Sequence, residues 1–311
     1  MGFGTRRGRL SEPLCRLLRF EATDGIGLAG LLYESRRRTQ RIAVFLHGTG
    51  GASVFHSRRT NLLADELTRR RIAWFAFNNR GANLVTKPQA GGGMAYERIR
   101  DCVHDIDGAV RLLRREGYRD ITLVGHSTGA NKIAVYDSLK RRNPIRRYVL
   151  LGGGDDVGLY YHQLGPVRFR ATLRKARERR RSRQLVPASI SRFPMSWRSL
   201  YDMINPDGDY NVFPFLEAFG RAKLSRRPLF RHIRGIRKPA LFVYGENDQY
   251  CSGSVSRAVS TLVEAAGSKP NFEFLIMQDA DHGFVGHERE LGALIGEWIN
   301  ATEPKRAPRT T

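Results

Sequence analysis

The sequence contains few cysteines, few lysines and no long hydrophobic run. Its three cysteines lie far apart and form no CxxC pair, which argues against a disulfide framework or a zinc ribbon and fits a reducing compartment. No apolar stretch reaches the ~18 residues that a membrane-spanning helix needs, so we expect no membrane span. The basic residues at the start are not followed by the apolar core of a signal peptide, and we therefore expect a cytoplasmic protein.

Acidic residues are scarce relative to basic ones. The 53 Lys and Arg residues outnumber the 30 Asp and Glu residues, which gives a formal net charge of +23. Nine basic residues and a single acid lie within residues 168–183. Such a charge attracts anions, but no element that reads nucleic acid accompanies it, so we expect no specific nucleic-acid partner. Whether the charge has a function or reflects composition stays open.

Short apolar runs of strand length alternate with segments of helical periodicity through most of the 311 residues. This alternation predicts an α/β protein with a mainly parallel sheet and helices on both faces. A turn at residues 23–25 joins the first two strands and predicts an antiparallel hairpin at the N-terminus. The expected strands are 16–22, 26–33, 42–46, 72–77, 121–124, 148–151, 241–244 and 272–277, and the expected helices are 56–70, 96–116, 130–140, 255–266 and 288–299.

Residues 155–238 interrupt this pattern with a basic segment that mixes aromatic clusters and prolines. The segment is too long for a plain loop in a compact domain. We therefore predict a basic cap lobe inserted between two strands of a core formed by residues 15–154 and 239–300. Residues 301–311 are expected to be a flexible tail.

The strongest local signal for chemistry is the motif GHSTG at 125–129, which follows an expected strand and precedes a helical run. A serine between two such glycines can occupy a strained strand-to-helix turn, because glycine tolerates the close approach of neighbouring backbone. The turn would lift the Ser127 hydroxyl out of the sheet. A serine hydroxyl needs a base to act as a nucleophile.

His282 is the candidate base because it follows a late strand and stands next to a glycine. A carboxylate should orient its imidazole, and Asp248 follows the preceding strand. Glu246, and Asp155 or Asp156 after an earlier strand, are alternatives. The chain order Ser, Asp, His is similar to that of the α/β-hydrolases, and this resemblance favours Asp248.

An oxyanion formed during acyl transfer needs backbone N–H donors. The loop HGTGG at 47–51 follows another buried strand, and its glycines let the backbone approach a substrate. We expect the N–H groups of Thr49 and Thr128 to be the two donors. His47 is expected to hold the loop by hydrogen bonds.

Together these segments resemble the α/β-hydrolase superfamily over about residues 15–153 and 239–300. The resemblance is carried by HGTGG at 47–51, NNRGA at 78–82, GHSTGA at 125–130, GENDQ at 245–249 and DADHGF at 279–284. It implies the α/β-hydrolase fold without a cofactor or a metal. Position by position, it implies Ser127 as nucleophile, Asp248 as acid, His282 as base, and Thr49 and Thr128 as oxyanion-hole residues.

Two features of the resemblance are more particular. The segment NNRG at 78–81 departs from the commoner Asp-x-Arg-Gly, and we interpret Arg80 as a residue that organises the loop. Together with GHSTGANK at 125–132 and the cap segments 195–200 and 208–213, it is similar to a poorly characterised group related to siderophore-ester hydrolases. This closer resemblance implies a small-molecule ester substrate that is bulky or anionic.

We therefore expect a serine hydrolase that cleaves a carboxylic ester through an acyl-enzyme. Thioesterase, acyltransferase, amidase and peptidase activities on the same three side chains are alternatives. A catalytically silent protein that serves as a scaffold or binds anions is the non-enzymatic alternative. The acyl group, the leaving group and the oligomeric state stay open.

Two further patterns carry weaker signals. The sequence GIGLAG at 25–30 fits the glycine spacing of a dinucleotide site, but it continues into a strand pattern instead of a helix. His104, Asp105 and Asp107 could suggest a metal site, but they lie on one helix whose polar face we expect to be solvated. We expect neither a dinucleotide nor a metal.

Overall fold

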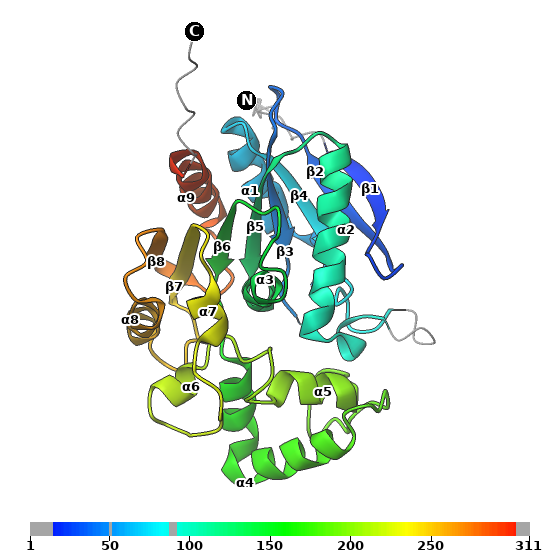
Figure 1. The fold of residues 1–311 in the computed structure, drawn as a ribbon, viewed down its shortest axis with the longest axis vertical. Helices are drawn as coiled ribbons and strands as arrows, with labels where there is room; N and C mark the ends of the chain where they lie inside the picture. Colours follow the sequence, from blue (N-terminus) through cyan, green and yellow to red (C-terminus); the bar gives the residue numbers. More distant parts are fainter. Residues whose placement is uncertain (1–14, 50–51, 87–91, 303–311) are drawn as a thin grey trace, which may run out of the picture.

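The computed structural model describes residues 15–49, 52–86 and 92–302 (Figure 1). Within them, eight strands form one sheet in the order β1-β2-β4-β3-β5-β6-β7-β8. β1 and β2 pair antiparallel, β2 also pairs antiparallel with β4, and all the other pairs are parallel. The strands are β1 (Cys15–Glu21), β2 (Gly27–Tyr33), β3 (Arg41–Leu46), β4 (Ala73–Asn78), β5 (Asp120–His126), β6 (Arg147–Leu151), β7 (Ala240–Asn247) and β8 (Phe272–Asp281). The mainly parallel sheet and the N-terminal hairpin confirm the sequence-based prediction.

Helices cover both faces of the sheet, as expected. α1 (Arg58–Arg69) and α9 (Glu288–Ala301) pack on each other against one face. α2 (Cys102–Arg115), α3 (Thr128–Leu139) and α8 (Val255–Ala266) cover the opposite face. The central strands are buried on both sides, which explains why their sequences are continuous apolar runs instead of alternating ones.

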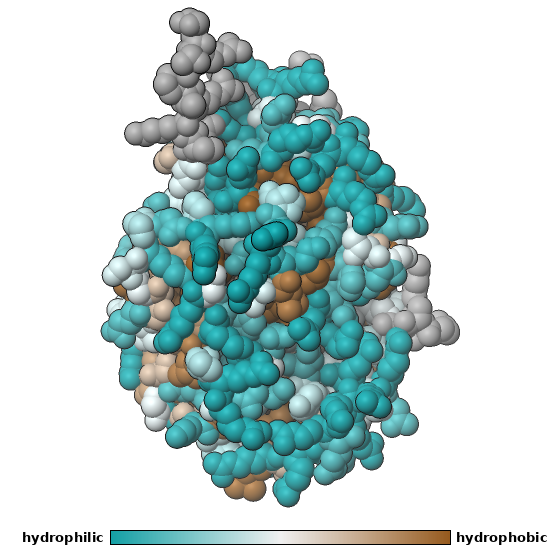
Figure 2. Space-filling model, in the orientation of Figure 1, coloured by the Kyte–Doolittle hydropathy of each residue, from teal (hydrophilic) through white to brown (hydrophobic). Residues whose placement is uncertain are grey.

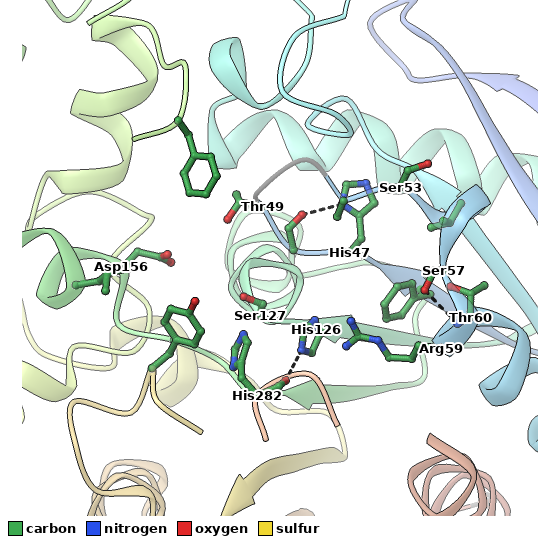
Figure 3. Close-up of a pocket in the computed structure, with 18 of the residues that line it drawn as sticks. His47, Thr49, Ser53, Ser57, Arg59, Thr60, His126, Ser127, Asp156 and His282 are labelled. Carbon is green, nitrogen blue, oxygen red and sulfur yellow. Dashed lines mark hydrogen bonds between the residues drawn. The ribbon is translucent and has the colours of Figure 1, made fainter. Parts of the chain in front are cut away.

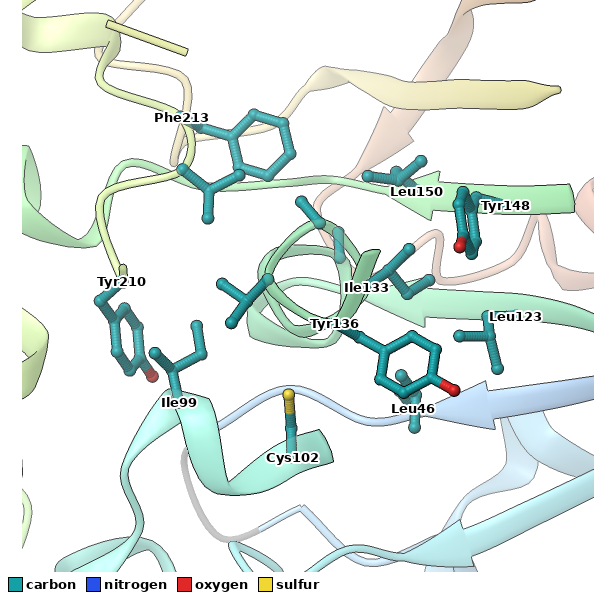
Figure 4. Close-up of a cluster of buried hydrophobic side chains, with 14 of the residues drawn as sticks. Leu46, Ile99, Cys102, Leu123, Ile133, Tyr136, Tyr148, Leu150, Tyr210 and Phe213 are labelled. Atoms are coloured by element: carbon teal, nitrogen blue, oxygen red, sulfur yellow. The ribbon is translucent and has the colours of Figure 1, made fainter. Parts of the chain in front are cut away.

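α3 is the most enclosed helix of the core. Its residues 128–137 are all buried, and a helix with buried residues on every side belongs in the interior of a protein. Figure 4 shows Ile133 and Tyr136 of α3 packed against Leu46, Leu123 and Leu150 of the central strands. This packing fixes the position of the first turn of α3, which begins at Thr128.

The helix expected over 96–116 begins later than predicted. The chain forms two short 3-10 helices, η2 (Met94–Tyr96) and η3 (Ile99–Asp101), before α2 begins at Cys102. Glu97 is extended, and its carboxylate forms a buried ion pair with Lys132 of α3. The N–H of Ile99 donates to Asp202. These contacts with distant parts of the chain override the local helical periodicity.

The segment between β6 and β7 contains α4 (Asp156–Glu178), α5 (Trp197–Ile204), α6 (Phe215–Ala218) and α7 (Arg231–Gly235). Figure 1 shows α4, α5 and α6 beyond the carboxyl end of the sheet, whereas α7 packs on α3 and α8. α4 is kinked at Gly165, which has a φ of 73° and precedes Pro166. Buried aromatic side chains such as Trp197 and Phe215 join this segment to the hydrophobic core.

The basic residues of 168–183 are exposed on and just after α4. Lys175 and Arg179 lie over the ring of Trp197, at 5.3 and 5.5 Å from its centroid. Figure 2 shows that hydrophilic side chains cover most of the face in view, including its lower part. The charge concentrated here therefore lies in solvent.

Three smaller expectations can be compared with the structure. GIGLAG at 25–30 runs into β2 with no helix after it, as predicted. No helix in the described residues is long and apolar enough to cross a membrane. Ala301, the first residue of the expected C-terminal tail, belongs to α9, and residues 303–311 of that tail lie outside the described residues.

Candidate active site

Ser127 occupies a sharp turn between β5 and α3. Its φ of 57° and ψ of −127° are rare for a residue with a side chain. A Cβ atom on Gly125 would lie 2.3 Å from the carbonyl oxygen of Gly129, and one on Gly129 would lie 2.1 Å from the carbonyl oxygen of Leu46. Only glycine fits at either position, so the motif GHSTG meets the steric demand of this turn.

The turn places Ser127 on the wall of a cavity of about 280 Å³ at the carboxyl edge of the sheet. His282, from the loop after β8, lines the same cavity, and Figure 3 shows its ring beside Ser127. Residues from the cap segment, including Asp156, Leu159 and Phe193, form part of the wall. The cavity therefore brings together residues that are more than 150 positions apart in the chain.

The imidazole of His282 is bound to Asp248. Nδ1 of His282 lies 2.8 Å from Oδ2 of Asp248, whose side chain is fully buried. Because a carboxylate only accepts, Nδ1 carries the proton and Nε2 is left for the cavity side. The other oxygen of Asp248 accepts the N–H of Tyr250 at 2.9 Å. A Cβ on Gly152 would lie only 3.0 Å from Oδ2 of Asp248, so the pair is closely packed.

The other carboxylates that the sequence left open have different partners. Glu246 accepts the N–H of Asp279 at 3.0 Å. Asp155 caps α4 by accepting the N–H of Gly158 and also accepts the N–H of Leu216, each at 2.7 Å. Asp156 accepts from the side chain of Asn131 at 3.1 Å. Among the described residues, Asp248 is the hydrogen-bond partner of Nδ1 of His282.

Two aromatic neighbours fix the His282 segment, and sequence reasoning missed both. His126 donates from Nε2 to the carbonyl oxygen of His282 at 2.7 Å, and the two ring centroids are 4.9 Å apart. The Tyr250 ring lies 4.4 Å from the His282 ring. Burial, together with the nearby charge of Arg59, holds the pKa of His126 well below its usual range, so this ring stays neutral. His126 stands between Gly125 and Ser127 in the motif GHSTG, and this place next to the serine was the sequence signal that could have identified it.

The loop after β3 contacts the turn that holds Ser127. A Cβ on Gly48 would lie 2.9 Å from the Cβ of Ser127, so the backbone passes directly over the serine. The hydroxyls of Thr49 and Thr128 are 3.2 Å apart. The two residues expected to supply oxyanion N–H groups are thus neighbours beside Ser127. Gly50 and Gly51 of the same motif lie outside the described residues.

His47 joins this loop to the loop after β4, as its expected structural role requires. Its Nδ1 donates to the carbonyl oxygen of Gly48 at 2.8 Å, and its Nε2 accepts the N–H of Asn79 at 3.2 Å. One nitrogen that donates and one that accepts define a neutral ring. Burial, assisted by the charge of Lys132, lowers the pKa of His47 to about 3, which keeps this form at all ordinary pH.

Arg80 organises the loop after β4, as its sequence context indicated. Its guanidinium binds Asp24 in the hairpin turn and Asp105 on α2, with N–O distances of 2.8 Å in both ion pairs. Asp105 is fully buried, so the expected solvated helix face is wrong at this position. The reason is the charge of Arg80, which compensates for burial of the carboxylate.

The described residues contain no group of three or more His, Cys, Asp or Glu suited to a metal.

The fold and sequence can be compared with known proteins. The esterase domain of a Rhodothermus marinus protein aligns with a TM-score of 0.56 and 17% identity, covering 93% of this chain and 98% of that one. Est1E from Butyrivibrio proteoclasticus, solved with ferulic acid, gives 0.62 and 13%, covering 91% and 98%. A monoglyceride lipase variant from Saccharomyces cerevisiae gives 0.60 and 13%, covering 94% and 96%.

A comparison with curated protein sequences gives no match. The structural similarities, all at low identity, establish the α/β-hydrolase fold that the motifs predict. At the family level, residues 37–290 match the family described as serine aminopeptidase, S33. This match covers most of the chain. The chain is therefore a serine hydrolase of the α/β-hydrolase fold and belongs to the serine aminopeptidase S33 family.

Proposed function

We propose that this protein hydrolyses a carboxylic ester through an acyl-enzyme, with Ser127 as nucleophile, His282 as base and Asp248 as the carboxylate that orients the base. One observation carries the proposal: Ser127 stands on a strained turn in a cavity shared with His282, whose Nδ1 is held by the buried Asp248 at 2.8 Å. This combination leaves Nε2 of the imidazole available to accept the serine proton.

The reaction then follows from these groups. Nε2 of His282 takes the proton from Oγ of Ser127 while Oγ attacks the ester carbonyl carbon. The N–H groups of Thr49 and Thr128 stabilise the tetrahedral oxyanion. Collapse of this intermediate breaks the bond to the leaving oxygen, which receives the proton from His282. Water, deprotonated by the same imidazole, attacks the acyl-enzyme and frees the acid and the serine.

The cap segment is proposed to select the substrate. Asp156, Leu159 and Phe193 of this segment line the cavity, so the size and polarity of one wall depend on the cap and not on the sheet. We propose a small-molecule ester that is bulky or anionic as the substrate. The cysteines in the described residues, Cys15, Cys102 and Cys251, are unpaired, which is compatible with action in the cytoplasm.

The test combines a covalent probe with ester turnover by the full chain. A fluorophosphonate probe should label the wild-type protein, which should also hydrolyse p-nitrophenyl butyrate. Ser127→Ala should abolish labelling and lower kcat by at least about 10⁴-fold. Ser260→Ala, an exposed serine on α8, is the matched control and should keep both. Turnover that survives Ser127→Ala would refute the assigned nucleophile.

The same assays separate the alternatives. The family description makes an aminopeptidase the second candidate, and faster turnover of aminoacyl p-nitroanilides than of matched aminoacyl esters would favour it. Thioester substrates and alcohol acceptors test for a thioesterase and an acyltransferase. A folded wild-type chain that the fluorophosphonate fails to label would favour a silent scaffold or an anion-binding protein.

A further inference from the structure

One side of the catalytic cavity holds polar groups that the proposed reaction does not use. Arg59 and Thr60 lie in the first turn of α1 and line this side. Figure 3 shows the guanidinium of Arg59 extending toward His126, across Ser127 from Asp156. The cavity is therefore polarised, with a cation on the α1 side and a carboxyl group on the cap side.

Neither polar group has a partner for its buried atoms within the part of the chain that the structure describes. Nη1 of Arg59 is buried and makes no hydrogen bond, and the Arg59 side chain forms no ion pair there. Thr60 is only 1% exposed, and its hydroxyl is likewise buried without a hydrogen-bond partner. Buried donors without acceptors are unfavourable, and a ligand with oxygen acceptors would remove this penalty.

The surrounding charges do not satisfy Arg59 directly. Asp281 and Glu288 attract the guanidinium from a distance, but burial has the larger effect and lowers its pKa. Asp281 accepts the N–H of Val285 at 3.0 Å. An arginine remains charged under these conditions, so the α1 side of the cavity keeps a positive charge. The N-terminal end of the 12-residue helix α1 adds a partial positive charge at the same place.

We propose that Arg59 and Thr60 form an anion subsite in the catalytic cavity, which binds a carboxylate carried by the ester substrate. The inference rests on the proposed function and narrows its substrate class. The planar guanidinium matches the two oxygens of a carboxylate, and the Thr60 hydroxyl supplies a further donor. A single cation with two acidic residues nearby suits a monoanion better than a dianionic phosphate. Asp156, on the opposite side of Ser127, makes the cap side unsuited to the same anion.

The test uses ester pairs that differ only in charge. One pair places the carboxylate on the acyl side: the p-nitrophenyl monoester of glutaric acid and its methylated, neutral counterpart. The other pair places it on the alcohol side: 4-acetoxybenzoate and its methyl ester. The anionic member of one pair should have a kcat/KM higher by about tenfold or more, chiefly through a lower KM. The pair that shows the preference identifies the side of the ester that carries the anion.

Variants assign the preference to the subsite. Arg59→Gln should remove the preference for the anionic ester, Arg59→Lys should keep part of it, and Thr60→Val should reduce it by less than Arg59→Gln. Arg69→Gln makes the same charge change on the same helix, where the exposed side chain pairs with Asp65, and should leave the preference intact. An anionic ester that is not preferred in either pair, or a preference that Arg59→Gln leaves unchanged, would overturn the proposal.

Failure of the subsite and failure of the esterase are distinguishable. Turnover of the neutral esters that depends on Ser127 tests the esterase alone. If no ester is turned over, binding of monomethyl glutarate, a monoanion, to the full-length protein still tests the subsite through the melting temperature. Monomethyl glutarate should raise the Tm of wild type and of Ser127→Ala but not that of Arg59→Gln. An equal response of wild type and Arg59→Gln, including no response in either, would count against the subsite.

Discussion

Nδ1 of His282 and Oδ2 of Asp248 are 2.8 Å apart, and the Asp248 side chain has no exposed surface while that of His282 retains 13%. The carboxylate is shielded from water and the imidazole remains accessible from the cavity. This asymmetry suits a carboxylate that orients a base, and it gives the first prediction.

Asp248→Asn should lower kcat for ester hydrolysis by about 10⁴-fold, because an amide can stabilise the tautomer of His282 that cannot accept the serine proton. Glu246→Gln is the matched control, since its carboxylate binds the N–H of Asp279 instead. Steady-state kinetics with p-nitrophenyl butyrate measure both. A loss of less than tenfold in Asp248→Asn would mean that another group orients the imidazole.

Gly129→Ala should destabilise the protein by about 1–3 kcal/mol or more, because the new Cβ would lie 2.1 Å from the carbonyl oxygen of Leu46. Gly27→Ala on β2 is the control, since a Cβ there meets nothing within 4 Å. Urea denaturation compares the free energies of unfolding. Equal stability of the two variants would contradict the steric account of the turn.

Lys132→Met should destabilise the protein by about 3–5 kcal/mol, because it leaves the buried carboxylate of Glu97 without its cation. Nζ of Lys132 lies 2.6 Å from Oε1 of Glu97, and the two side chains are 1% and 6% exposed. Lys140→Met removes the partly exposed pair with Asp107 and should cost less than about 1 kcal/mol. The double variant Lys132→Met/Glu97→Gln should recover part of the loss in urea denaturation. No recovery would show that loss of this ion pair is not the cause of the destabilisation.

The substitution Asp156→Asn should increase the free energy of unfolding relative to wild type, and this gain should grow as the pH rises. Burial, followed by the charge of Asp155, raises the pKa of Asp156 from 3.8 to about 7. The folded state then binds more protons than the unfolded state between about pH 4 and 7, so stability falls as the pH rises through this range. The gain of Asp156→Asn at pH 8 should be roughly 1–3 kcal/mol after allowance for partial exposure. Melting temperatures at pH 5 and pH 8 test this, and a pH-independent difference would contradict it.

The charge on α4 should bind polyanions only weakly. The basic residues of 168–183 are exposed, so heparin binding should be lost below ~0.3 M salt. A salt gradient on a heparin column measures this. Retention beyond that concentration would support the anion-binding alternative.

The core strands and the turn at Ser127 could be predicted from the sequence because each is determined by residues close together in the chain. The strands of the core could be located because they are short apolar runs buried on both faces. The turn at Ser127 could be located because only glycine tolerates the backbone contacts made at Gly125 and Gly129. Each of these signals lies within a few residues of the feature it specifies.

Other features were decided only by the tertiary structure. The start of α2 depends on Glu97, which pairs with Lys132 from another helix. Asp105 is buried because Arg80 reaches it from a different loop. Several carboxylates near strand ends were compatible with the sequence, and the fold brings Asp248 to His282. Periodicity along one segment carries no information about a charge that arrives from a distant one.

Arg59 is the clearest example of a residue whose environment depends on distant segments. In the sequence it is one of many arginines in a chain with a net charge of +23. Only the packing of α1 on one face of the sheet brings its first turn, and with it this arginine, to the cavity beside Ser127. The turn that holds Ser127 is encoded locally, whereas the polarity of the surrounding pocket arises from contacts between distant segments, because burial and charge compensation are properties of the folded chain.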